Sequence, residues 1–399
     1  MKAPLTSKRS LLSLLGYAVL ILVPSFDTVY KYFGLLGLGI YFLIGSAALY
    51  LGTTVAYPYL SQRISKRAAD ILAVIAFVAL TITTSIFYQM ANSGRFGRGS
   101  DADDAMVTAA TELLTGHFPY YHPTYLGNPI SPMPGAILLS LPFVLLGIIW
   151  FQNIFWIGVF FLIARSRTRN SFIGLFVLGL ILVSPTVFQN LFTGSDYIAN
   201  AIYVAAAMWF LIEGVTDRET PEWWRVLSAV FLGVALSSRS NFVLVLPILF
   251  SVIYQLGGIR SAIKYFLIAG FACLAVTLPF YLYYPAGFTP LIVQASKVGE
   301  LDAFLPYAGI LIPLAGLVLA GVLALKRYLA NDAAFYRNCA IVQLVVLLLA
   351  SAIWSLKLGK LDIFIGQSGY GMFTLGFAMF AFWLSYFNGA DKKIPETTT

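Results

Sequence analysis

Residues 70–91, DILAVIAFVALTITTSIFYQMA, form an apolar stretch in which the first residue, Asp70, is the only charged one. A helix needs about 20 mainly apolar residues to cross the hydrocarbon core of a bilayer, so this stretch predicts a transmembrane helix. Further apolar runs lie near residues 11–28, 34–58, 133–164, 172–190, 197–214, 225–237, 241–257, 263–283, 307–325, 339–355 and 364–387. We therefore predict a single all-α integral-membrane domain over residues 1–399, a polytopic bundle of about 12 spans.

The composition excludes a soluble globular protein. Hydrophobic residues make up 59% of the chain and charged residues 11%, whereas soluble domains contain about 25% charged residues. The formal net charge of +8 does not indicate nucleic-acid binding, because excess Lys and Arg in a membrane protein mark its cytoplasmic loops. Cys273 and Cys339 lie in or beside apolar runs and predict neither a disulfide framework nor a metal site.

The distribution of basic residues predicts the orientation of the chain. With the N-terminus in the cytoplasm, the extracytoplasmic segments carry only 7 of the 25 basic residues. These are Lys31, Arg95, Arg98, Arg239, Lys297, Lys357 and Lys360. Since cytoplasmic loops carry the excess of Lys and Arg, we predict a multi-pass protein of the cell membrane with both termini in the cytoplasm.

One long loop interrupts the apolar pattern at residues 93–132, SGRFGRGSDADDAMVTAATELLTGHFPYYHPTYLGNPISP. It lies outside the cytoplasm in this orientation, and it holds both histidines of the chain and a cluster of acids. Apolar residues at helical spacing predict an amphipathic helix on the outer leaflet, with its apolar side toward lipid. These residues are Met106, Ala109, Ala110, Leu113 and Leu114. Ionisable groups gathered in one loop of an apolar chain indicate a chemical site.

Asp101, Asp103 and Asp104 form a DxDD string at the start of this helix. Acids there can simply cap the helix, but three of them within four residues repel one another and exceed what a cap requires. An ionised carboxylate at the membrane surface can act as general base toward a sugar hydroxyl, so all three are catalytic candidates. The string can also bind a divalent cation, but no second acid cluster completes the shell, and we predict no metal and no cofactor.

The loop continues with GHFPYYHPTYLGNPISPMPG, residues 116–135, which is rich in aromatic and turn-forming side chains. Rings can stack on a sugar, and imidazole, phenol and amide groups can form hydrogen bonds with it. His117, Tyr120, His122 and Asn128 are therefore candidate substrate ligands. An interfacial belt of aromatic side chains is the alternative explanation for the tyrosines.

A second candidate cluster lies in ALSSRSNFVLVLP, residues 235–247, where Arg239 stands between two serines. A planar guanidinium can grip two phosphate oxygens, so Arg239 is a candidate phosphate ligand. A turn arginine that snorkels to lipid headgroups is the alternative. The other candidate substrate ligands at this membrane edge are Asp196, Asn241, Lys357 and Lys360.

Three motifs follow the acidic loop in chain order: NPISPMPGAILLSLPFVLLG at 128–147, NLFTGSDY at 190–197 and VFLGVALSSRSNF at 230–242. With the loop aspartate before them, they resemble integral-membrane glycosyltransferases of the GT-C fold. The resemblance is to the mannosyltransferase-like bacterial branch, which uses polyprenyl-phosphate sugars. It covers roughly residues 70–256, and the remaining spans match only in hydropathy.

This resemblance implies a GT-C-like enzyme of the bacterial inner membrane. It implies transfer of a sugar, mannose being one candidate, from a polyprenyl-phosphate donor to a lipid, glycan or protein acceptor on the extracytoplasmic face. Asp101 best matches the catalytic aspartate of the family, with Asp103 and Asp104 as competitors. Arg239 falls at the later basic residue of the family, although Ser240 follows it where proline is common.

A lipid-linked-sugar flippase or transporter without transferase activity is the alternative function. A transporter is expected to place ionisable groups in the middle of discontinuous spans, whereas here they gather at one membrane face. The sequence contains neither GxGxxG opening a helix nor GxxxxGK[ST]. Both observations favour surface chemistry on a lipid-phosphate donor, with the bilayer and no nucleic acid as partner.

Overall fold

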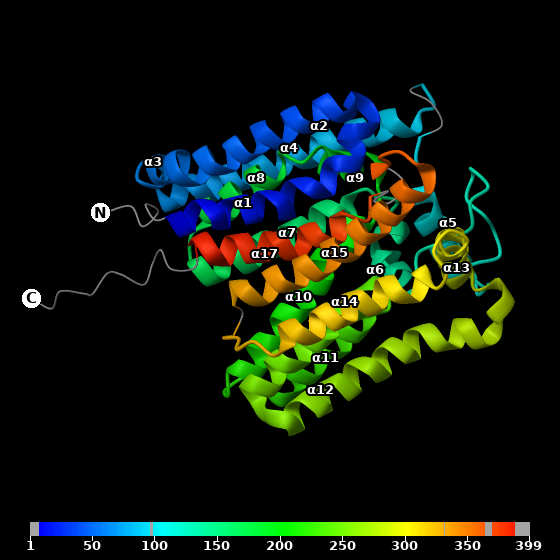
Figure 1. Cartoon of the computed structure of the whole chain (residues 1–399). Coiled ribbons are helices and arrows are strands. Elements are labelled where there is room, and N and C mark those ends of the chain that lie inside the picture. The colour runs from blue at the N-terminus through cyan, green and yellow to red at the C-terminus, as the bar shows by residue number, and fades with distance from the viewer. Residues whose placement is uncertain (1–7, 96–98, 331, 364–368, 388–399) are drawn as a thin grey trace, which may run out of the picture.

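The computed structural model describes residues 8–95, 99–330, 332–363 and 369–387, and this part of the chain contains helices and turns but no strand. Most helices run along one direction, while α13 is seen end-on and crosses it (Figure 1). The α-helices are α1 (Lys8–Leu22), α2 (Phe26–Leu51), α3 (Tyr57–Ser61), α4 (Lys66–Asn92), α5 (Ala102–Leu114), α6 (Pro134–Leu145), α7 (Phe151–Thr168), α8 (Ser171–Ile181), α9 (Pro185–Thr193), α10 (Tyr197–Thr216), α11 (Glu222–Leu236), α12 (Leu246–Tyr283), α13 (Thr289–Asp302), α14 (Ala308–Ala324), α15 (Ala333–Leu358) and α17 (Met372–Phe387). The short 3-10 helices are η1 (Val23–Ser25), η3 (Ser240–Val245) and η4 (Pro285–Gly287), and η2 (Gly52–Ala56) is a short π-helix.

Five helical segments of the described chain are long and apolar enough to cross a bilayer, as expected of a multi-pass membrane protein. They are Leu11–Ser61, Lys66–Asn92, Tyr197–Thr216, Ser240–Tyr283 and Ala333–Leu358. The bent pair α8 and α9 adds a sixth when it is counted as one span. The shorter helices α6, α14 and α17 are also apolar. The count of about 12 crossings stays a prediction.

Two of the five segments fold back on themselves at a glycine. Gly34 interrupts the first segment with a φ of 63°, and Gly258 interrupts the fourth with a φ of 79°. On either side of Gly258, the rings of Phe250 and Phe266 lie 5.0 Å apart, so the two arms pack together. Glycine is favoured at both turns because residues with a Cβ rarely adopt a positive φ. The runs expected over 241–257 and 263–283 are therefore two helical arms that are separated at the non-helical Gly258.

Two other apolar runs do not form one helix each. Residues 133–164 form α6 and α7, which separate near Gly147, where φ is 68°. Residues 172–190 form α8 and α9, which bend by 93° relative to each other. Pro185 is the first residue of α9. It lacks an N–H and restrains the residue before it, so α8 cannot continue straight through this position.

The amphipathic helix predicted in the long loop is α5, but its apolar face does not lie on lipid. Met106, Ala109 and Ala110 are fully buried in the protein. They pack in clusters that include Ala136 and Ile137 of α6. The predicted lipid contact is therefore wrong for these three residues, because the chain after α5 turns back and covers them with protein, whereas Leu114 is 49% exposed.

Polar contacts mark the two ends of α4. Near its start, Asp70 forms an ion pair of 3.1 Å with Arg165 of α7. Near its end, the Tyr88 hydroxyl donates a hydrogen bond of 2.7 Å to Asp103 of α5. The helical rise places Asp70 and Tyr88 about 27 Å apart, close to the thickness of a bilayer core. The end of the bundle that carries α5 and the end that carries Arg165 are therefore separated by a membrane-sized distance.

Cysteine labelling tests the predicted orientation. In a background with Cys273 and Cys339 replaced by alanine, Thr115→Cys and Ser166→Cys each add one exposed thiol, at opposite ends of the bundle. A membrane-impermeant thiol reagent should label Thr115→Cys in intact cells and Ser166→Cys only after the cells are opened. Labelling of Ser166→Cys in intact cells would reverse the orientation and place α5 in the cytoplasm.

Candidate functional site

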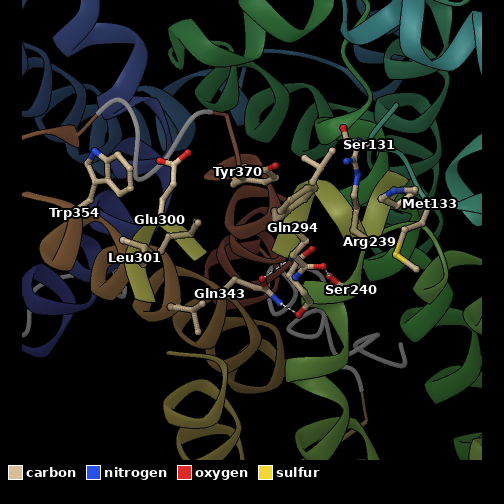
Figure 2. A pocket seen from close by; sticks show the side chains of 17 residues that line it. Ser131, Met133, Arg239, Ser240, Gln294, Glu300, Leu301, Gln343, Trp354 and Tyr370 are labelled. Carbon is tan, nitrogen blue, oxygen red and sulfur yellow. Dashed lines mark hydrogen bonds between the residues drawn. The ribbon is translucent and has the colours of Figure 1, made fainter. Parts of the chain in front are cut away.

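Two hollows meet at the end of the bundle that carries α5. The larger hollow has a volume of about 450 Å³ and the smaller hollow about 300 Å³. Ser131, Arg239 and Val293 line both hollows, so these residues form their common wall. Figure 2 shows Arg239 on one side of the larger hollow and Trp354 on the other.

The two hollows differ in chemistry. The charged and polar side chains of the smaller hollow come from the N-terminus of α5, the following loop and the N-terminus of α10: Asp101, Thr124, Asn128, Asp196 and Tyr197. Alanine and proline side chains of α5 and of the loop also line it. The larger hollow has an apolar wall from α13 and α15, which includes Val293, Leu301, Val346, Leu347 and Ala350. The same two helices also carry the polar lining residues Gln294, Glu300 and Gln343, and Ser240 and Asn241 of η3 are polar lining residues as well. A ligand that fills both would be amphiphilic, with its polar part in the smaller hollow.

Close backbone packing holds Arg239 at the common wall. The turn between α11 and η3 carries Arg239 in an extended conformation, with φ −154° and ψ 134°. The N–H of Gly135, at the start of α6, donates a 3.2 Å hydrogen bond to the carbonyl of Ser237 in this turn. A Cβ at Gly135 would lie 2.1 Å from the Ser237 Oγ. Glycine at this position therefore lets α6 approach the turn and brings Ser131 beside Arg239.

Arg239 and Asp196 form a buried ion pair. The Arg239 Nη2 lies 2.8 Å from each carboxylate oxygen of Asp196, and the two side chains are 8% and 3% exposed. Asn200 donates a further hydrogen bond of 2.8 Å to the Asp196 Oδ2. The guanidinium carbon lies 5.0 Å from the centre of the Tyr197 ring. The alternative of a snorkelling arginine does not fit a side chain that is buried and paired in this way.

Asp101 lines the smaller hollow and uses only one of its carboxylate oxygens in hydrogen bonds with the described residues. Its Oδ2 accepts hydrogen bonds from the Thr124 hydroxyl at 2.6 Å and from the Asn128 amide at 2.8 Å. Its Oδ1 accepts no hydrogen bond from the described residues. The carboxylate is therefore fixed through one oxygen while the other is available to a ligand, which is the arrangement a general base requires.

The other two acids of the DxDD string point elsewhere. The Asp103 Oδ2 accepts hydrogen bonds from the Tyr88 hydroxyl at 2.7 Å and from the Asn92 amide at 3.1 Å. Burial raises the pKa of the Asp103 carboxyl, and the hydrogen bond from Tyr88 partly offsets the rise. The Asp104 Oδ2 accepts the backbone N–H of Tyr125 at 2.8 Å. Neither acid lines a hollow, so the three carboxylates do not converge on one point.

The remaining sequence candidates divide into two groups. Asn128 and Asp196 line the smaller hollow, and Asn241 lines the larger one, where its amide donates a 2.8 Å hydrogen bond to Gln343. Lys357 donates to the backbone carbonyl of Glu300 at 2.8 Å, beside the larger hollow but not in its wall.

Four candidates lie outside both walls. His117 and His122 are 65% and 66% exposed, and both contact Glu112, at 3.3 and 3.8 Å. Tyr120 is buried and donates to the Pro132 carbonyl at 3.2 Å. Lys360 follows α15 and lines neither hollow. These four residues are not brought together with Asp101 in the structure, because the histidines pair with Glu112 and the Tyr120 ring fills the core under α5.

Several wall residues were missing from the sequence-based candidates. Gln343 is the single polar residue between Cys339 and Ala350, and that interruption of the apolar run was the available signal. Gln294 and Ser240 join α13 to η3 through a hydrogen bond of 2.9 Å. Tyr370 and Trp354 carry no distinguishing pattern, because aromatic residues are common throughout this chain. Within the described chain, no three His, Cys, Asp or Glu residues are placed to hold a metal ion.

A glycine pair tests the packing that supports the site. Gly194 precedes α10 with a φ of 67°, and a Cβ there would lie 2.9 Å from the Asp103 Cβ and 3.0 Å from the Tyr88 ring. Gly116 has a φ of 79° and open space around it. Left-handed strain alone costs about 1–2 kcal/mol for alanine, so Gly194→Ala should lower the unfolding temperature in detergent further than Gly116→Ala. Equal losses would show that the contact with Asp103 does not constrain the fold.

Comparison with known proteins gives no relative from which a function can be carried over. No family model matches the chain, no curated protein matches it, and no solved structure matches it. The functional assignment therefore depends on the geometry of the two hollows.

Proposed function

We propose that this protein is a membrane glycosyltransferase of GT-C type that moves a sugar from a polyprenyl-phosphate donor to a hydroxyl-bearing lipid, glycan or protein acceptor. One observation supports this most strongly. Asp101, with a free carboxylate oxygen, and Arg239, with unused guanidinium nitrogens, line the same hollow although they are far apart in sequence. Mannose is the first sugar to test, and the extracytoplasmic face of the cell membrane is the proposed side.

In the proposed reaction, the acceptor hydroxyl oxygen attacks the anomeric carbon of the donor sugar. Asp101 takes the hydroxyl proton on its Oδ1 while Thr124 and Asn128 hold the Oδ2. The bond between the anomeric carbon and the phosphate oxygen breaks, and its electron pair leaves with the lipid phosphate. Arg239 donates hydrogen bonds to the phosphate oxygens, on which charge develops in the transition state.

The larger hollow offers a place for the first isoprene units of the donor. Most of its lining residues from α13 and α15 are apolar, and Arg239 lies at its boundary with the smaller hollow. An amphiphile with a phosphate between a sugar and a hydrocarbon tail matches this order of polar hollow, guanidinium and apolar hollow. Burial of apolar tail surface in the larger hollow would add about 25 cal/mol per Å² to binding.

A transfer assay tests the proposed function. Purified protein, radiolabelled polyprenyl-phosphate sugars and a membrane extract as acceptor source should give a labelled product. Asp101→Asn should lower the rate by about 10²-fold or more, because general-base catalysis commonly contributes this much. Asp104→Asn removes the same charge from the same loop but faces neither hollow, so it should retain much more activity.

Two outcomes would contradict the proposal. Full activity in Asp101→Asn would remove the proposed base. Movement of labelled lipid across the bilayer of proteoliposomes, with no transfer to any acceptor, would instead favour the flippase alternative.

Substitution of Arg239 by lysine tests the phosphate role. Lysine keeps the charge that Asp196 needs but has no planar edge for a second set of hydrogen bonds. Arg239→Lys should therefore raise the apparent donor KM and lower kcat, by about tenfold or more in kcat/KM. Arg95→Lys makes the same change at an exposed position away from both hollows and is the matched control. Unchanged kinetics in Arg239→Lys would take Arg239 out of the site.

A further inference from the structure

The guanidinium of Arg239 is only partly used by the protein. Both of its hydrogen bonds to Asp196 come from the single nitrogen Nη2. The Nε is buried without a partner, and the Nη1 donates to no other described residue. A buried donor without a partner is costly unless a ligand or water completes it. Arg239 lines both hollows, so its Nη1 is left to donate to a ligand with acceptor oxygens, while the Nε beside it lies buried and unpaired.

The charge of this guanidinium is already balanced. Asp196 cancels it at 2.8 Å, and both partners are more than nine-tenths buried, so the cancellation is weakly screened by salt. Asp101 adds a second carboxylate to the wall of the smaller hollow. Among the side chains that the structure describes, the charged groups that line the smaller hollow are thus one guanidinium and two carboxylates. An anion that approaches gains hydrogen bonds from Arg239, but each negative charge that it carries is repelled by Asp196 and Asp101.

We propose that Asp196 sets the charge of the ligand that this site accepts: a lipid phosphate group with one negative charge, and not one with two or more. This rests on the proposed function, because the donor is a phosphodiester with one negative charge. The leaving lipid phosphate is a monoester, which ionises a second time with a pKa of about 6. Asp196 is thus a specificity-determining residue that favours the donor over the product and over lipids linked through a diphosphate.

The charge of Asp196 favours the forward direction of the proposed reaction. The bond between the sugar and the phosphate breaks, the acceptor proton moves to Asp101, and the phosphate gains a second negative charge next to the Arg239–Asp196 pair. Arg239 stabilises the developing charge, while Asp196 makes the fully formed product dianion a weaker ligand than the donor was. Release of the spent lipid is therefore favoured over its retention.

Direct binding of three lipids tests this proposal without any sugar transfer. The lipids share one polyprenyl chain and carry a methyl phosphodiester, a phosphate monoester or a diphosphate, and pH 8 keeps the monoester doubly charged. Wild-type protein in detergent should bind the diester about tenfold more tightly than the diphosphate, with the monoester between them. Asp196→Asn retains an acceptor oxygen for Arg239 and Asn200 but removes one charge. This variant should bind the diphosphate lipid more tightly, so that its preference for the diester over the diphosphate falls to about threefold or less.

Asp103→Asn is the matched control, since it removes a buried carboxylate of the same end of the bundle that faces neither hollow. Asp103→Asn should prefer the diester over the diphosphate by the same factor as the wild-type protein. Equal affinity of the wild-type protein for diester and diphosphate would overturn the proposal, and that measurement needs no variant to fold. An unchanged ratio in folded Asp196→Asn would overturn the role of Asp196.

These results separate the inference from the proposed function. Charge selection without sugar transfer to any acceptor would support the role of Asp196 in selecting singly charged lipids and would contradict the proposed glycosyltransferase function. Sugar transfer without charge selection would support the glycosyltransferase and contradict the proposed role of Asp196. Asp196→Glu keeps the charge and should keep the order of the three lipids.

Discussion

Arg239 and Asp196 are both more than nine-tenths buried at the end of an apolar bundle. Charges in such a place are tolerated only when an opposite charge and further hydrogen bonds replace the lost water. This requirement fixes the start of α10 against the turn between α11 and η3, because the two side chains must stay 2.8 Å apart. The two hollows lie on either side of the paired arginine, so their positions follow from the same contact.

Much of the helical architecture could be predicted from the sequence, because the transfer of apolar residues into lipid depends on local composition. The runs over 70–91, 197–214 and 339–355 correspond to α4, α10 and α15. The breaks were harder to predict, since they depend on backbone angles that hydropathy does not report. Pro185, for example, divides one expected run into α8 and α9. The packing of α5 on α6 depended on where the returning loop lies, which is a tertiary property.

The candidate site was partly predictable, because ionisable residues are conspicuous beside apolar runs. Asp101 and Arg239 stood out as ionisable residues next to apolar runs, and they line the same hollow. Asp103 and Asp104 could not be separated from Asp101, because the direction of each side chain depends on where α5 begins. Gln343 and Gln294 line the larger hollow from helices that are distant in sequence. Only the folded chain places them beside Asn241 and Ser240.

A structure of the protein with a bound polyprenyl phosphodiester tests the central claim most directly. In an electron cryo-microscopy map, the phosphorus should lie at the common wall of the hollows, with its oxygens within hydrogen-bond distance of the Arg239 Nε or Nη1. The hydrocarbon chain should enter the larger hollow between α13 and α15. Density for the phosphate at the exposed histidines of the loop after α5, with both hollows empty, would contradict the account.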